Sequence, residues 1–121
     1  MLYSVRAAID VPSDSQEEIS LAIQEVFSQL LAFNSTLLPE SALNIFFTQT
    51  ADLKSKNPAL ALRESFPQWG VVPLICAQEV EVTGMLPRCI RLLVQWQSNE
   101  TASPSPVYLR GAANLRPDLI K

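Results

Sequence analysis

Apolar and polar residues alternate along the first segment of the chain, residues 2–11. A period of two predicts a β-strand with one face to bury. That face consists of Tyr3, Val5, Ala7, Ile9 and Val11. Arg6 lies in the middle of the opposite face, so this face must meet solvent, a ligand or another subunit.

Two helices are predicted from apolar spacing and capping signals. Apolar residues recur every three or four positions over residues 14–34, and acidic residues fall in the first turn, where they complement the helix dipole. Asn57 and Pro58 are typical of an N-cap followed by the first helical residue, which predicts a short helix through Phe66. The long helix should bury Ile19, Ala22, Ile23, Val26, Leu30 and Phe33.

Further apolar segments predict the rest of the sheet. Residues 41–49, centred on Ile45, Phe46 and Phe47, are typical of a buried strand. Regular structure is not expected beyond Pro117. We therefore expect one α+β domain over residues 1–121, with about five strands and two helices. The remaining strands are predicted at 71–76, 89–97 and 106–113.

Composition and charge exclude several classes of protein. A hydrophobic content of 48% with 17% charged residues is that of a globular domain. The net charge of −3 disfavours binding to nucleic acid through its phosphates. No apolar window approaches the roughly 18 residues of a membrane span, and the N-terminus lacks a secretion signal. We predict a cytosolic protein.

The chain contains no histidine, which restricts the chemistry it can perform. Ser-His and Cys-His nucleophiles are excluded, and so is the commonest general base. Cys76 and Cys89 are too few for a disulfide framework or, without histidine, for a convincing zinc site. Cys76 is expected to be a small buried residue, with a reactive thiolate as the alternative. An enzyme of this composition must use carboxylates or need no proton transfer.

The stretch from Cys76 to Arg91 holds the main candidate site. Glu79 ends one apolar strand and Arg91 lies near the start of the next. The two charges form either a simple ion pair or two walls of a polar pocket. Six of the nine cations are Arg, whose planar fork binds carboxylates through two hydrogen bonds, although surface ion pairs explain such a preference equally well. Several Arg, Glu79 and Tyr108 together suit a small polyanion with a hydroxyl group, or a reaction that needs only charge stabilisation.

Runs of residues along the chain are similar to those of one known family. The most specific run extends from Val72 to Gly84 and is followed by Cys89-Ile90-Arg91. With these runs the sequence resembles the small, trimeric, monofunctional chorismate mutases of the AroH class, over nearly its whole length. The other runs are Val5-Arg6-Ala7-Ala8, Asp14 to Ile19, Asp52-Leu53, Pro58-Ala59, Leu62-Arg63-Glu64, Val107-Tyr108-Leu109 and Leu115 to Leu119.

The resemblance implies a fold, an assembly and a reaction. The fold is a mixed sheet with helices on one side, and three subunits close into a pseudo-barrel with active sites in the clefts between neighbours. The reaction is the Claisen rearrangement of chorismate to prephenate, on the route to phenylalanine and tyrosine, without a cofactor. A unimolecular pericyclic reaction needs no base, which is compatible with a chain that lacks histidine.

The resemblance also implies roles for individual residues. Arg91 would contact the ether oxygen and one carboxylate as the C–O bond breaks, and Glu79 with Cys76 would receive the ring hydroxyl. Arg6 and Tyr108 would hold the other carboxylate from across the interface. Further substrate contacts are implied for Arg63, Ile75, Leu74, Ala59 and Asn57, and Arg63, Leu115 and Arg116 would close the entrance.

The sequence departs from the family pattern at several positions. Asn57 replaces a Phe, Leu60 a Lys, and Met85 the second Gly of a turn; Ala7 replaces a Gly, and Leu74-Ile75 replace a more polar pair. One extra residue lies around Pro67–Gly70. These changes bear on substrate affinity and tail closure more than on the chemical step. The alternatives are a non-catalytic trimer that binds a small carboxylate and a purely structural assembly module.

Overall fold

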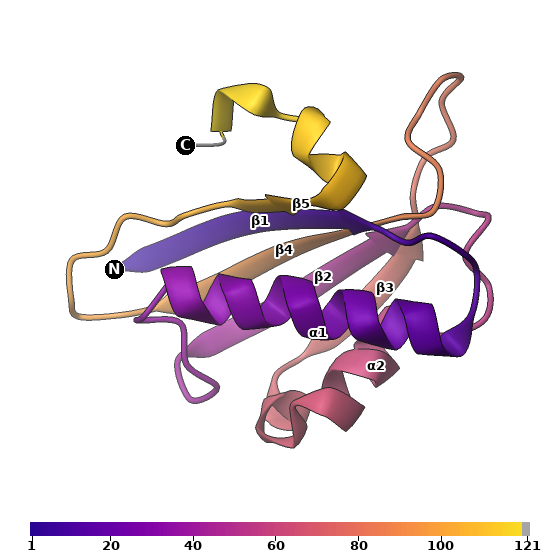
Figure 1. Cartoon of the computed structure of the whole chain (residues 1–121). Helices are drawn as coiled ribbons and strands as arrows, with labels where there is room; N and C mark the ends of the chain where they lie inside the picture. The colour runs from indigo at the N-terminus through magenta and orange to yellow at the C-terminus, as the bar shows by residue number, and fades with distance from the viewer. Residues whose placement is uncertain (120–121) are drawn as a thin grey trace.

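The fold is a five-stranded mixed sheet with two helices packed on one face (Figure 1). The computed structural model describes residues 1–119. The strand order is β3-β2-β4-β1-β5, in which β4 pairs antiparallel with β1 and β2, while β3 pairs parallel with β2 and β5 parallel with β1. This confirms the expected fold class. The elements are β1 (Leu2–Asp10), α1 (Gln16–Phe33), β2 (Ala42–Gln49), α2 (Pro58–Ser65), β3 (Leu74–Gln78), β4 (Cys89–Gln97) and β5 (Val107–Leu109).

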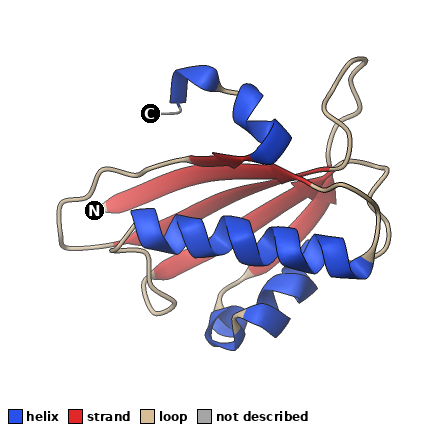
Figure 2. Cartoon of the chain, in the orientation of Figure 1, coloured by secondary structure: helices blue, strands red, loops and turns tan. Residues whose placement is uncertain are grey.

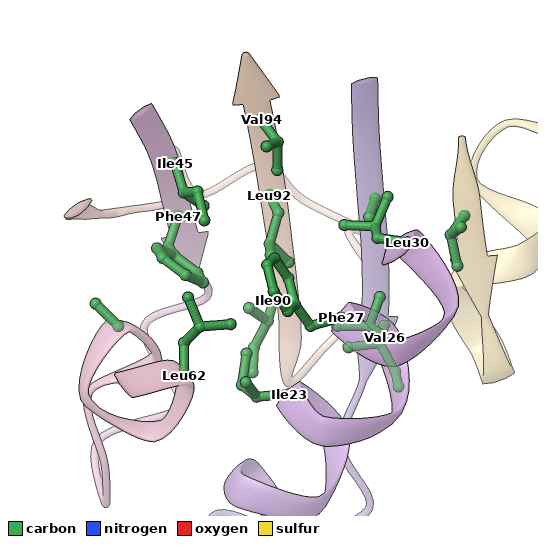
Figure 3. Close-up of a cluster of buried hydrophobic side chains, with 14 of the residues drawn as sticks. Ile23, Val26, Phe27, Leu30, Ile45, Phe47, Leu62, Ile90, Leu92 and Val94 are labelled. Carbon is green, nitrogen blue, oxygen red and sulfur yellow. The ribbon is translucent and has the colours of Figure 1, made fainter. Parts of the chain in front are cut away.

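The core lies between the sheet and the two helices, which cover the same face (Figure 2). Ser15 caps α1 by accepting a hydrogen bond from the Glu18 N–H, and Asn57 caps α2 as predicted. Because the apolar stripe of α1 faces the inward side chains of the strands, both elements bury most of their apolar positions together. Phe33 was expected in this stripe, but it is the last residue of α1 and its side chain is 61% exposed. Figure 3 shows Ile23, Val26, Phe27 and Leu30 of α1 and Leu62 of α2 packed against Ile45, Phe47, Ile90, Leu92 and Val94.

The opposite face of the sheet, called here the outer face, is mostly uncovered within one chain. A 3-10 turn after β5, Arg110–Asn114, covers one corner, where Ala112 packs with Ala8 and Cys89. Elsewhere large apolar side chains meet solvent: Phe46 is 38% exposed, Ile75 60% and Leu93 43%. Among residues 1–119 no helix combines the length and apolar character that crossing a membrane requires.

Two sequence predictions fail on this face and at its edge. Phe46 was expected inside a buried strand, yet it points to the outer face because β2 alternates and Ile45 and Phe47 occupy the core side. The strand predicted at 71–76 begins only at Leu74 and continues to Gln78. Its expected start belongs to a 3-10 turn, Pro67–Val71, that buries Trp69 edge-on against Phe27.

The C-terminal segment also differs from its prediction. The strand expected over 106–113 is only three residues long, because the chain turns away at Arg110, where φ is +54°. Gly111 then approaches Asp10 closely: its N–H donates to Asp10 Oδ1 at 2.8 Å, and an added Cβ would lie 2.6 Å from the carboxylate. Past the expected end of regular structure, Pro117–Leu119 forms a short 3-10 turn. Residues 120 and 121, also part of the predicted irregular tail, lie outside the described residues.

Candidate active site

Strand pairing aligns the polar residues of the outer face. Thr48 of β2 pairs with Arg91 of β4, Arg91 pairs with Ala8 of β1, and Ala8 pairs with Tyr108 of β5. Paired residues in a sheet point to the same side, so these side chains form one row across four strands. Arg6, two positions from Ala8 on β1, lies on the same face in the adjacent row.

These residues line a cavity of about 290 Å³, called here the arginine cavity. It contains three guanidinium groups, from Arg6, Arg91 and Arg116, with the carboxylate of Glu79 and the phenol of Tyr108. Ala7, Phe46, Thr48, Leu92 and Leu93 complete its wall. A concave site with three cations and one acceptor is suited to a small anion that also carries a hydroxyl group.

Glu79 and Arg91 form an ion pair with each other, and both side chains also line this cavity. The Glu79 Oε2 atom lies 3.7 Å from Arg91 Nε, too far for a good hydrogen bond. Thr48 Oγ1 donates a hydrogen bond to the same oxygen. Because both side chains are partly exposed, this pairing contributes little to stability, and the carboxylate and guanidinium remain available to a ligand.

Arg116, one of the residues that line this cavity, binds a carboxylate of its own segment, Asp118. Its Nη2 lies 2.8 Å from Asp118 Oδ2 and its Nε lies 3.0 Å from Oδ1, so the fork is bidentate. These hydrogen bonds hold the pKa of the Asp118 carboxyl below its usual range, and the Arg6 charge lowers this pKa further. The charges of Arg116 and Arg6 therefore favour a negative charge beside them.

A second cavity, called here the helix cavity, lies between α2 and β3 and has a volume of about 460 Å³. Arg63 supplies its cation, and within residues 1–119 Arg63 forms no ion pair. The Cys76 thiol donates to Asn57 Oδ1 at 3.4 Å, while the same oxygen accepts the α2 N-terminal N–H groups of Ala59 and Leu60. The cavity is lined by Asn57, Ala59, Arg63, Gly70, Val72, Leu74, Ile75 and Cys76.

The structure thus divides the predicted site residues between two places. One chain brings Arg6 and Tyr108 to Arg91, although the resemblance placed them across an interface from it. Cys76, expected beside Glu79, lies in the helix cavity instead. In the described chain no residue lines both cavities. Leu115 lines neither and packs beside the small cluster of Ala8, Cys89 and Ala112.

Comparison with known proteins identifies the family. The family model described as chorismate mutase type I matches residues 2–119. The chain belongs to this family. It is 41% identical to the chorismate mutase AroH of Thermus thermophilus, over 98% of this chain and 97% of that protein. It is 35% identical to the chorismate mutase AroH of Bacillus subtilis strain 168, over 98% of this chain and 93% of that protein.

The fold agrees with this assignment. A solved chorismate mutase from Clostridium thermocellum superposes with a TM-score of 0.83 at 30% identity, covering 91% of this chain and 96% of that one. The sequence resemblance, the fold class and the chorismate mutase activity, an isomerase activity, are confirmed. Within residues 1–119 no cluster of three or more His, Cys, Asp or Glu could hold a metal ion.

Some uncharged residues that line the arginine cavity of this chorismate mutase were not identified as site residues from the sequence. Thr48, Phe46 and Leu93 all line it. Alternation along residues 89–97 is sufficient to place Leu93 on the same strand face as Arg91. Alternation in β2 would have put Thr48 and Phe46 on one face, but three consecutive apolar residues, Ile45 to Phe47, conceal the period.

The two cysteines of this chorismate mutase differ in environment. Cys76 was expected to be buried, but it is partly exposed at the wall of the helix cavity. Cys89 is 3% exposed, and burial raises the pKa of its thiol to about 11. A thiol that stays protonated and inaccessible is a poor nucleophile.

Iodoacetamide in mildly alkaline buffer is therefore expected to alkylate Cys76 and to leave Cys89 unmodified in the folded protein. Peptide mass spectrometry after a short reaction measures the adduct at each position. The same reaction in urea is the control and should label both. Modification of Cys89 ahead of Cys76 in the folded protein would contradict the assigned environments.

Proposed function

We propose that this chorismate mutase converts chorismate to prephenate at sites built between subunits of a homotrimer. Each site would join the arginine cavity of one subunit to the helix cavity of its neighbour. The observation that carries the proposal is the division of the family-type polar residues between two separate cavities in one chain. The arginine cavity lacks Arg63, Cys76 and the other family-type residues that line the helix cavity, so neither cavity alone contains the whole family-type set.

The exposed outer face supports this assembly. Phe46 and Leu93 flank the arginine cavity and Ile75 flanks the helix cavity, and all three are large apolar residues in contact with solvent. Apolar exposure of this kind is typical of a surface that another subunit covers. A contact between two different patches closes into a ring when the rotation allows it. Three subunits are what the family resemblance implies.

The proposed mechanism assigns each charge to one part of the substrate. Arg91 stabilises the negative charge that develops on the ether oxygen as the C–O bond breaks, and Arg6 with Tyr108 binds a carboxylate. Glu79 accepts the hydrogen bond of the ring hydroxyl. Together they hold the flexible substrate in the compact shape from which the new C–C bond forms, so the reaction needs no general base.

The neighbouring subunit and the tail complete the enclosure. Arg63, with Cys76, Ala59, Asn57, Leu74 and Ile75 around it, forms the second wall. Arg116 and Leu115 close the entrance, and Asp118 would release the Arg116 fork when a substrate carboxylate takes its place. We further infer that residues 1–121 act as one domain and that the product feeds phenylalanine and tyrosine synthesis in the cytoplasm.

The test is an assay of the purified protein by the loss of chorismate absorbance, with its mass measured by light scattering on the same sample. The expected results are a rate far above the uncatalysed background and the mass of a trimer. A folded trimer without a rate above background would favour the non-catalytic carboxylate-binding alternative. An active monomer would contradict the shared site.

A further inference from the structure

Thr48 stands between the two charged residues at the centre of the arginine cavity. Thr48 pairs with Arg91 on β4 and with Ala77 on β3. Ala77 precedes Glu79 by two residues. The Thr48 side chain lies on the outer face, lines the cavity and donates a hydrogen bond to Glu79 Oε2. Neither the charge pattern nor the family-type motifs of the sequence include it.

Glu79 depends on this contact for its orientation. The residue lies just past the end of β3, where its N–H still donates to the Gln49 carbonyl at 2.8 Å. Its backbone is therefore fixed, but its side chain retains three torsions. Both contacts that the structure shows for the carboxylate, from Thr48 and from Arg91, use Oε2, and within residues 1–119 none uses Oε1.

Threonine is well suited to orient a carboxylate at this position. Its branched Cβ restricts χ1 in a strand, so the hydroxyl points in a fixed direction. A hydrogen bond to an ionised carboxylate is also stronger than a neutral one. Without it, the carboxylate could rotate toward Arg91 Nε, now 3.7 Å away, and close a direct pair that consumes both groups.

We propose that Thr48 is a positioning residue of the active site. By holding Oε2, its hydroxyl presents Oε1 to the substrate hydroxyl and keeps the Arg91 fork open for the ether oxygen. The inference rests on the proposed role of Glu79. Thr48 itself does not contact the substrate.

A double-mutant cycle with chorismate as substrate tests this. Thr48→Val keeps the branched shape and removes the donor, while Thr48→Ser keeps the donor. Thr48→Val should lower kcat by about tenfold, the usual effect of losing a hydrogen bond to a charged group. It should leave KM and the thermal midpoint nearly unchanged, and Thr48→Ser should recover most of the loss. Thr101→Val, the same substitution at an exposed loop residue, is the matched control.

The cycle also requires Glu79→Gln and the double variant. If Thr48 acts through Glu79, then Thr48→Val should have almost no further effect on kcat in the Glu79→Gln background. An equal loss in both backgrounds would overturn the inference, because Thr48 would then act on the substrate directly. Wild-type kcat in Thr48→Val would overturn it too. Wild-type kcat in Glu79→Gln would instead refute the proposed role of Glu79, so the two failures are distinguishable.

Discussion

Replacing Arg91 with lysine is expected to lower kcat by roughly 100- to 1,000-fold, or about 3–4 kcal/mol of transition-state stabilisation. Lysine keeps the positive charge but loses the planar fork that contacts the ether oxygen and a carboxylate together. The lysine ammonium sits on a flexible side chain, so it would not be held beside the ether oxygen, where negative charge develops in the transition state. KM should change less, because Arg6 and Arg116 still bind carboxylates in the same cavity. Steady-state loss of chorismate absorbance measures both constants.

Arg110→Lys is the matched control for this substitution. Arg110 pairs with Glu25 at 3.3 Å and donates to the Asp10 carbonyl, and it lies outside the arginine cavity. The control should retain wild-type kcat. Near-normal turnover by Arg91→Lys would refute the role assigned to Arg91, since the charge alone would then suffice.

The regular elements could be predicted from the sequence because their signals are local. The strand expected at 89–97 has those bounds in the structure, and the helix expected at 14–34 spans Gln16–Phe33. In both, burial on one face sets the period of the apolar residues. The prediction fails where contacts between residues far apart in sequence determine where a strand begins or ends. β5 ends at Leu109 because Gly111 binds Asp10, and β3 begins only at Leu74 because the preceding turn packs Trp69 on Phe27.

The candidate site could be predicted as a set of residues but not as an arrangement. Sequence order separates Arg6, Arg91 and Tyr108, and only the order of the strands brings them into one cavity. The Thr48 hydroxyl carries no charge or motif signal, so its contact with Glu79 becomes visible only through the pairing of β2 with β3 and β4.

The division into two cavities is the feature that makes assembly part of the mechanism. Within residues 1–119, neither Arg6 nor Arg63 forms an ion pair, and they line different cavities. An arginine without a carboxylate partner in the protein is suited to bind an anionic ligand. A ligand that contacts both Arg6 and Arg63 would have to span the two subunits that contribute the two cavities. One site should therefore assemble from two subunits that each carry a different defect.

Mixed trimers of Arg91→Ala and Arg63→Glu subunits are therefore expected to regain activity that each variant has lost. Arg91→Ala removes the cation from the arginine cavity, and Arg63→Glu places a carboxylate against an anionic substrate in the helix cavity. In a ring of three with both kinds of subunit, one interface always pairs two intact cavities. Such trimers should show about one third of wild-type kcat per trimer.

The decisive measurement is the chorismate assay on trimers purified through two different affinity tags, one on each variant. Activity near one third of wild type, with both parent homotrimers at least about 100-fold less active, is the predicted result. Mixed trimers as inactive as their parents would contradict the account, because every site would then lie within a single subunit that carries one defect.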